Sequence, residues 1–147
     1  MRLPSAVYTE PGRLFSVTIG TSPRLPVFAD IPFGRECVNL LKDLRDKEGL
    51  RVYAYCLMPD HAHLLAAMTS RESLSSAVRS WKSRCYNERH RSGNPARFWQ
   101  RSFFDRALRD DANFLDTAMY ILGNPVRAEI VKDFHDYPLC GSLEFEL

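Results

Sequence analysis

The sequence predicts one domain in which β-strands alternate with α-helices, and three observations support this. The chain has 147 residues, which is the usual size of a single domain. Hydrophobic residues make up 45% of it and charged residues 26%, a balance typical of folded proteins rather than disordered ones. Strand-like segments alternate with segments whose apolar residues recur at helical spacing, without internal repeats. We therefore expect a single domain over residues 1–147.

The first expected elements are a strand, a turn and a helix. Residues 14–19 favour β-structure and are closed by Gly20, after which the stretch 21–26 is rich in turn-forming residues. Apolar residues between 37 and 44 recur at helical spacing and stop before Gly49. A glycine there is suited to the left-handed conformation that ends many helices. The sequence therefore predicts a strand followed by a helix that ends at Gly49.

The middle of the chain predicts two strands joined by a tight turn, and then a second helix. Residues 51–57 and 61–68 are apolar runs, and the Pro-Asp pair at 59–60 between them is a turn signal. Apolar residues between 74 and 85 form a helical stripe with basic residues around it. The Gly-Asn-Pro stretch at 93–95 ends this pattern. We expect a strand, turn, strand unit and then a basic amphipathic helix.

The last third predicts one more strand and one long helix. Residues 98–108 alternate loosely between apolar and polar side chains, as a strand does. Asp110 or Asp111 can cap a helix that ends at the Gly-Asn-Pro stretch 123–125, because a proline disfavours helical conformation in the residue before it. We expect Asn124 in the final turn of that helix.

Composition argues against a membrane protein and against a disulfide-rich secreted protein. No apolar run approaches the roughly 18 residues that span a bilayer, and Glu10, Pro11 and Arg13 interrupt the start of the chain, where a signal segment would be apolar. The four cysteines lie far apart without a CxxC pair, so neither a disulfide framework nor a closed zinc site is indicated. We expect a soluble, cytoplasmic protein with reduced cysteines.

Positive charge is concentrated in one segment. Residues 79–109 hold nine basic and two acidic residues, a net charge of +7, although the whole chain carries only +2. Such asymmetry is expected of a domain that presents a basic face to a nucleic acid, the alternative being a solvated helix face. Aromatic rings interleaved with the charges can stack on unpaired bases or belong to the core. These rings are Trp81, Tyr86, Phe98, Trp99, Phe103 and Phe104.

Two histidines in the third expected strand form a candidate metal site. Side chains alternate between the two faces of a strand, so the imidazoles of His61 and His63 point the same way. They can share one cation, while the alternating apolar residues that follow face the helices. The spacing alone is a weak signal, because two histidines can also be ordinary surface or core residues, and two imidazoles are too few for a metal site.

The last helix carries a tyrosine opposite its apolar stripe. At 100° per residue, Tyr120 falls on the polar side together with Asp116, Thr117 and Asn124. Tyr120 and Asn124 are four residues apart, so their side chains are neighbours and can serve one phosphate. The expected core-facing stripe consists of Phe114, Leu115, Ala118, Ile121 and Leu122.

Three segments in this order, YCLMPDHAHLLAAM, FWQRSFFDRAL and YILGNPVRAEIV, resemble the single-tyrosine HUH transposases, and most of all the REP-associated tyrosine transposases. The resemblance runs from about residue 14 to the end of the chain. It implies an α+β fold, an antiparallel sheet packed with helices in a ferredoxin-like arrangement. It also implies an enzyme that cuts and rejoins single-stranded DNA beside short hairpins.

The resemblance assigns roles to particular residues. His61 and His63 become metal ligands, joined by Asn124, which stands where many insertion-sequence relatives have glutamine. Tyr120 becomes the nucleophile, forming a 5′-phosphotyrosine link that conserves bond energy, so that no nucleotide cofactor is needed. Mg²⁺ or Mn²⁺ suits phosphate chemistry with these ligands, and imidazoles shift the balance of affinity toward Mn²⁺ or Zn²⁺. The active form is expected to be a monomer or a homodimer.

DNA contacts are expected from the basic segment. We place Arg79, Lys82, Arg84 and Arg101 at phosphates, while Gln100 and Arg101 are candidates for reading bases. The expected partner is single-stranded DNA with hairpins and not a membrane. Two other functions remain open. One is an inactive regulator that binds hairpin DNA or RNA, and the other is a metal-dependent phosphoesterase that uses water, which would leave Tyr120 without a purpose.

Overall fold

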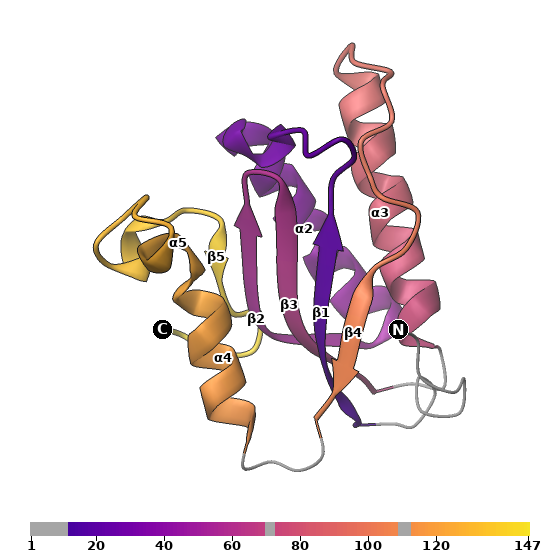
Figure 1. The fold of residues 1–147 in the computed structure, drawn as a ribbon. Helices are drawn as coiled ribbons and strands as arrows, with labels where there is room; N and C mark the ends of the chain where they lie inside the picture. The colour runs from indigo at the N-terminus through magenta and orange to yellow at the C-terminus, as the bar shows by residue number, and fades with distance from the viewer. Residues whose placement is uncertain (1–11, 70–72, 109–112) are drawn as a thin grey trace.

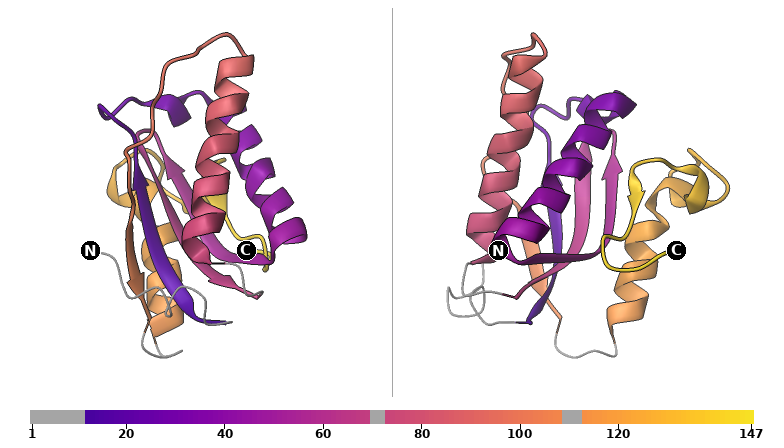
Figure 2. Two further views of the ribbon diagram at one scale, coloured as in Figure 1. Left: turned by 90° about the vertical axis from the view of Figure 1, so that its right-hand side faces the viewer. Right: turned by 180° about the vertical axis from the view of Figure 1, so that it is seen from behind.

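The computed structural model describes residues 12–69, 73–108 and 113–147. Its centre is a five-stranded sheet with the strand order β4-β1-β3-β2-β5, in which all the pairings are antiparallel. Two long helices, α2 and α3, cover one face of the sheet and α4 lies on the other (Figures 1 and 2). The expected α+β fold with an antiparallel sheet is therefore confirmed.

Three strands form the middle of the sheet. β1 (Leu14–Gly20) pairs along its whole length with β3 (His61–Met68), which forms a hairpin with β2 (Leu50–Met58). The short edge strands are β4 (Phe104–Ala107) beside β1 and β5 (Cys140–Gly141) beside β2. β1, β2 and β3 lie where the sequence predicts strands, whereas β5 was not predicted.

The two predicted long helices are present, and the first of them ends at Gly49 as predicted. The Asp30 side chain accepts a hydrogen bond from the main chain at the start of α2 (Ile31–Glu48), after the short helix η1 (Val27–Ala29), and Gly49 ends α2 with φ of 76°. α3 (Leu74–Arg91) packs against α2 through Trp81. That side chain is fully buried, and its indole N–H donates to a main-chain carbonyl of α2 at 2.9 Å.

The predicted strand over 98–108 is only partly confirmed, because only the four residues of β4 form a strand. Before them the chain follows β1 through single hydrogen bonds, such as that from the Gln100 N–H to the Gly20 carbonyl at 3.0 Å. The neighbouring side chains of Phe98 and Trp99 both pack into the core. A regular strand would send them to opposite faces, so this stretch cannot continue as one.

The predicted last helix ends at the predicted Gly-Asn-Pro stretch, but it does not include Asn124. α4 (Phe114–Leu122) stops before Gly123, and Asn124 is the first residue of the short helix α5 (Asn124–Arg127) instead of lying in the final turn of α4. Pro125 explains the break, because proline lacks the N–H that would continue the α4 hydrogen bonds. The proposed caps at 110 and 111 lie outside the described residues. The helix η3 (Phe134–Asp136) then leads to β5.

The C-terminal segment is clamped to the domain by Glu144. The side chain of Glu144 is 8% exposed, and it accepts hydrogen bonds from Arg45 at 2.8 and 3.0 Å and from Arg51 at 3.1 Å. The Val52 N–H also donates to it. Burial acts to raise the pKa of Glu144, but these donors outweigh it and hold the pKa below its usual value.

Candidate active site

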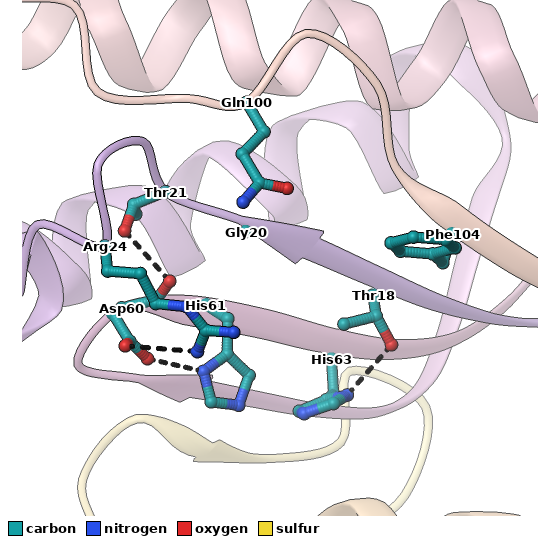
Figure 3. A pocket seen from close by; sticks show the side chains of 9 residues that line it. All are labelled: Thr18, Gly20, Thr21, Arg24, Asp60, His61, His63, Gln100 and Phe104. Carbon is teal, nitrogen blue, oxygen red and sulfur yellow. Dashed lines mark hydrogen bonds and ion pairs between the residues drawn. The ribbon is translucent and has the colours of Figure 1, made fainter.

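His61 and His63 lie side by side on β3, as the strand alternation predicts. Their ring centroids are 4.7 Å apart and the ring planes are nearly perpendicular. Together with Thr18 and Phe104 they line a cavity of about 300 Å³, which we call the histidine pocket (Figure 3). Its remaining lining residues are Gly20, Thr21, Arg24, Asp60 and Gln100.

Each imidazole is held by a hydrogen bond at Nδ1. The His61 Nδ1 lies 2.6 Å from a carboxylate oxygen of Asp60, and the His63 Nδ1 lies 3.2 Å from the Thr18 hydroxyl. The bond to His61 lowers the pKa of Asp60, and Arg24 forms an ion pair with the same carboxylate at 3.6 Å. Histidine ligands of metals are usually oriented by a hydrogen bond from the second ring nitrogen to a carboxylate, a main-chain carbonyl or water, and Asp60 is such a partner for His61. The arrangement leaves Nε2 of both rings for a ligand.

His63 is in the protonation state that a ligand needs. Burial lowers its pKa to about 4, helped by the positive charges of His61 and Arg127. At neutral pH the ring is therefore uncharged and keeps a lone pair. The donor set thus fits a divalent cation bound by two imidazoles.

A third protein ligand would have to be an amide or a hydroxyl. Within the described ranges, no cluster of three or more His, Cys, Asp or Glu residues could hold a metal. Gln100 lines the histidine pocket (Figure 3), and its amide lies directly over Gly20, where a Cβ would be 3.0 Å from it. Asn124 does not line this pocket, and its amide N–H₂ donates to the Ile121 carbonyl at 3.0 Å. Sequence reasoning placed Gln100 with the DNA contacts and did not consider it at the metal site.

Tyr120 is exposed on α4, on the side of the helix that the wheel predicts. Its side chain is 61% exposed and lines a second cavity of about 380 Å³ with Ser16 and Arg106, which we call the tyrosine pocket. Asn113, Asp116 and Thr117 complete its lining. The wheel is wrong at two other positions, because Leu115 is 65% exposed and Thr117 is buried. The helix is rolled toward Thr117, so the predicted stripe is displaced to one side.

The two pockets adjoin on the same face of the sheet. Ser16 and Arg106 are directly paired across β1 and β4, and so are Thr18 and Phe104. The first pair belongs to the tyrosine pocket and the second to the histidine pocket. The two pairs are two positions apart along the strands, a distance of about 7 Å. The tyrosine and the histidines of one chain therefore lie on neighbouring parts of one surface.

Arg127 connects these two parts electrostatically. Its guanidinium carbon lies 3.8 Å from the centroid of the Tyr120 ring, and its Nη2 donates to the Tyr120 carbonyl at 2.6 Å. The same charge contributes to lowering the pKa of His63, after burial and the charge of His61. Sequence reasoning assigned no role to Arg127.

Four of the five predicted DNA contacts meet at a third cavity, of about 310 Å³, between α3 and residues 97–101. They are Arg79, Lys82, Gln100 and Arg101. Arg84 does not line this cavity. The aromatic rings divide as well. Trp81 is buried in the core, and Phe103 packs partly buried against it. Phe98 is buried but lines this cavity together with Tyr86 and Trp99, and Phe104 is 67% exposed at the histidine pocket.

The comparisons agree with this architecture. The sequence model described as "Transposase IS200 like" matches residues 15–123, and the chain belongs to this family of IS200-like transposases. Among curated proteins, a candidate REP-associated tyrosine transposase of Haemophilus influenzae is 28% identical over 95 residues. That match covers 55% of this chain and 54% of the relative, so it spans about half the length of that protein.

Two solved structures share the fold. One is a REP-associated tyrosine transposase bound to a REP hairpin, with a TM-score of 0.73 and 24% identity, over 90% of this chain and 78% of that one. The other is a candidate transposase from Deinococcus radiodurans, with a TM-score of 0.56 and 19% identity, over 82% and 95% of the two chains. No helix in the described part of this chain is long and apolar enough to cross a membrane.

Proposed function

We propose that this protein is a metal-dependent enzyme that cuts and rejoins single-stranded DNA beside hairpins, with Tyr120 as its nucleophile. One observation carries the proposal. The tyrosine pocket and the histidine pocket adjoin on one face of the sheet, because each is lined by one of two neighbouring residue pairs, or rows, across β1 and β4. One phosphodiester lying across these rows would meet a phenol oxygen from one side and two imidazoles from the other.

The histidines supply the metal site in this proposal. His61 and His63 would hold Mg²⁺ or Mn²⁺ through Nε2, with an amide oxygen of Gln100 or Asn124 as a further candidate ligand. Such an ion polarises a phosphate and stabilises the charge that develops on it. Asp60 and Thr18 orient the rings, which lowers the cost of assembling the site.

Tyr120 would carry out the strand cleavage. Its phenol oxygen attacks the phosphorus and gives up its proton, while the bond from phosphorus to the 3′ oxygen breaks. The leaving 3′ oxygen takes up a proton, so the products are a 5′-phosphotyrosine and a 3′-hydroxyl. Attack by that hydroxyl reverses the step and rejoins the strand, so no nucleotide cofactor is consumed.

Arg127 has a positioning role in this mechanism. Its contact with the ring face and its hydrogen bond to the Tyr120 carbonyl hold the tyrosine at the edge of the tyrosine pocket. The guanidinium also brings a positive charge to the place where a phosphate would bind. Because the tyrosine pocket and the histidine pocket of a single chain adjoin, we propose that a monomer cleaves with its own tyrosine. An enzyme acting on cellular DNA in this way would work in the cytoplasm.

A covalent adduct tests the proposal. The protein is incubated with a hairpin-bearing single-stranded oligonucleotide and Mg²⁺ or Mn²⁺, and a denaturing gel is examined for a shifted protein–DNA band. We expect the band in the wild type and in Tyr53→Phe, a matched control whose ring packs against Phe114 on another part of the surface. We expect no band in Tyr120→Phe, with DNA binding retained. Binding without an adduct in the wild type would overturn the proposal and favour the inactive regulator.

A further inference from the structure

The cavity between α3 and residues 97–101 has a composition suited to one kind of ligand. We call it the arginine pocket. Four of its lining residues are basic and none is acidic. Its volume of about 310 Å³ lies at the lower end of the range for small-molecule sites. The lining residues are Arg79, Lys82, Ser83, Tyr86, Arg97, Phe98, Trp99, Gln100 and Arg101.

The arginines of this pocket are available to a ligand, whereas the lysine is part of its wall. Arg79, Arg97 and Arg101 are exposed, and within the described residues their guanidinium groups form no hydrogen bond or ion pair. The Lys82 ammonium instead donates to the Gln100 carbonyl at 2.6 Å, and its burial and the charge of Arg79 lower its pKa. The pocket therefore combines a fixed wall with three free guanidinium groups, which are suited to phosphate oxygens.

Three aromatic residues line the pocket: Phe98 is buried, and the polar atoms of the other two, Tyr86 and Trp99, are already bonded within the protein. The Tyr86 hydroxyl donates to the Pro95 carbonyl at 3.2 Å, and the Trp99 indole N–H donates to the Lys82 carbonyl at 3.0 Å. What these side chains present to the cavity is therefore ring surface. Base stacking on aromatic rings, combined with positive charge along the backbone, is the usual way in which proteins hold unpaired nucleotides.

Gln100 joins the arginine pocket to the histidine pocket, because it lines both. Its main chain is held by Lys82 on one side and by Gly20 on the other. A strand whose phosphate lies at the histidines would thus reach the arginine pocket by passing this one side chain. The connection between the pockets therefore favours a polymer, which can occupy both at once, over a free small molecule, which would occupy only one.

We propose that the arginine pocket binds an unpaired nucleotide of the DNA strand close to the cleaved phosphodiester. The base stacks on Trp99 and Tyr86, and the phosphate contacts the guanidinium groups. This inference rests on the proposed function, since it names where the substrate continues beyond the histidine pocket. It adds a site for which a single base, and not only the backbone, is the ligand.

Trp99 fluorescence provides a direct test. The chain has two tryptophans, and Trp81 is fully buried, so a ligand in the pocket changes the emission of Trp99. The Tyr120→Phe protein, without metal, is titrated with octathymidylate while anisotropy of a labelled strand measures binding. We expect quenching that follows binding, and its loss in Trp99→Phe. Arg97→Ala and Arg101→Ala should each weaken binding about tenfold, whereas Lys42→Ala, an exposed charge on α2, should not.

Several results would overturn the inference. One is binding of the octamer without a change in Trp99 emission, and another is equal quenching by an abasic strand. Octauridylate binding ten times more tightly than octathymidylate would assign the pocket to RNA. Because neither metal nor cleavage is involved, the outcome is separate from the adduct assay. If an adduct forms but Trp99 is not quenched, only the proposed role of the arginine pocket is refuted. If Trp99 is quenched but no adduct forms, the cleavage proposal is refuted and the arginine pocket stands as a nucleotide-binding site.

Discussion

The guanidinium carbon of Arg127 lies over the ring of Tyr120, 3.8 Å from its centroid, and Nη2 of the same guanidinium donates a hydrogen bond to the Tyr120 carbonyl. The two residues are on different helices, α4 and α5, with the break at Gly123 between them. The break at Gly123 therefore turns the chain back, so that the Arg127 side chain of α5 contacts Tyr120 on α4.

Arg127→Ala should slow adduct formation between about tenfold and a hundredfold, because a misplaced nucleophile loses that much rate. Arg127→Lys should recover part of it, since a lysine keeps the charge but not the planar contact. Single-turnover rates at saturating DNA measure the effect. Lys132→Ala, an exposed cation nearby in sequence, is the control and should behave as the wild type. Unchanged rates in Arg127→Ala would show that this contact has no part in cleavage.

Asp60→Asn should weaken metal binding about tenfold to a hundredfold, because it removes the carboxylate that orients the His61 ring. Titration calorimetry with Mn²⁺ on the protein alone measures this without DNA. His61→Ala and His63→Ala should abolish the binding, and a chelator should abolish adduct formation in the wild type. Asp43→Asn, an exposed carboxylate of α2, serves as the control. Equal Mn²⁺ affinity in His63→Ala and the wild type would contradict the metal site.

Phe104→Ala should lower the affinity for single-stranded DNA about tenfold, because a ring that is 67% exposed at the histidine pocket is placed to stack on a base. Its exposure means that stability should change little. Fluorescence anisotropy with a labelled octamer gives the affinity, and thermal unfolding checks the fold. Phe145→Ala removes a ring that is 54% exposed elsewhere and should leave the affinity unchanged. A similar loss in both variants would argue against stacking at Phe104.

Glu144→Gln should lower the free energy of unfolding at pH 7 by about 1–3 kcal/mol, since it weakens a largely buried set of charged hydrogen bonds. The folded-state pKa of Glu144 lies below its usual value, so its contribution is present above that usual value and disappears as the pH falls through the folded-state pKa. Urea unfolding of both proteins at several pH values should show the difference shrinking in acid. Glu146→Gln, at an exposed carboxylate two residues away, should have little effect at any pH. A difference that is constant with pH would exclude the ionised clamp.

Local patterns were sufficient for most of the elements. The positions of β1, β2, β3, α2 and α3 follow from apolar spacing and from turn residues, because each depends on neighbours in the chain. The wheel for α4 correctly placed Tyr120 in solvent but misplaced Leu115 and Thr117. A wheel gives the angles between side chains of one helix. Which angle faces the sheet depends on the strands beneath, and these come from distant parts of the sequence.

Gln100 and Arg127 were the residues of the site that patterns could not assign. Gln100 belongs to an irregular segment, held by single hydrogen bonds to β1, so no periodicity indicates where its amide points. Arg127 lies beyond the Gly123 break, where the angles of the α4 wheel no longer apply. The side-chain positions of both residues depend on tertiary contacts, which only the folded chain provides.

The sequence by itself determined that two imidazoles share one side of a strand and that a tyrosine stands in solvent on its helix. Both are consequences of bond geometry within a few residues. Only the tertiary structure decided that the histidines and the tyrosine lie on the same face of one sheet, next to each other. That proximity depends on the pairing of β1 with β3 and β4 and on the packing of α4 over the sheet. Contacts of this kind join residues that are far apart in the chain, and no local pattern contains them.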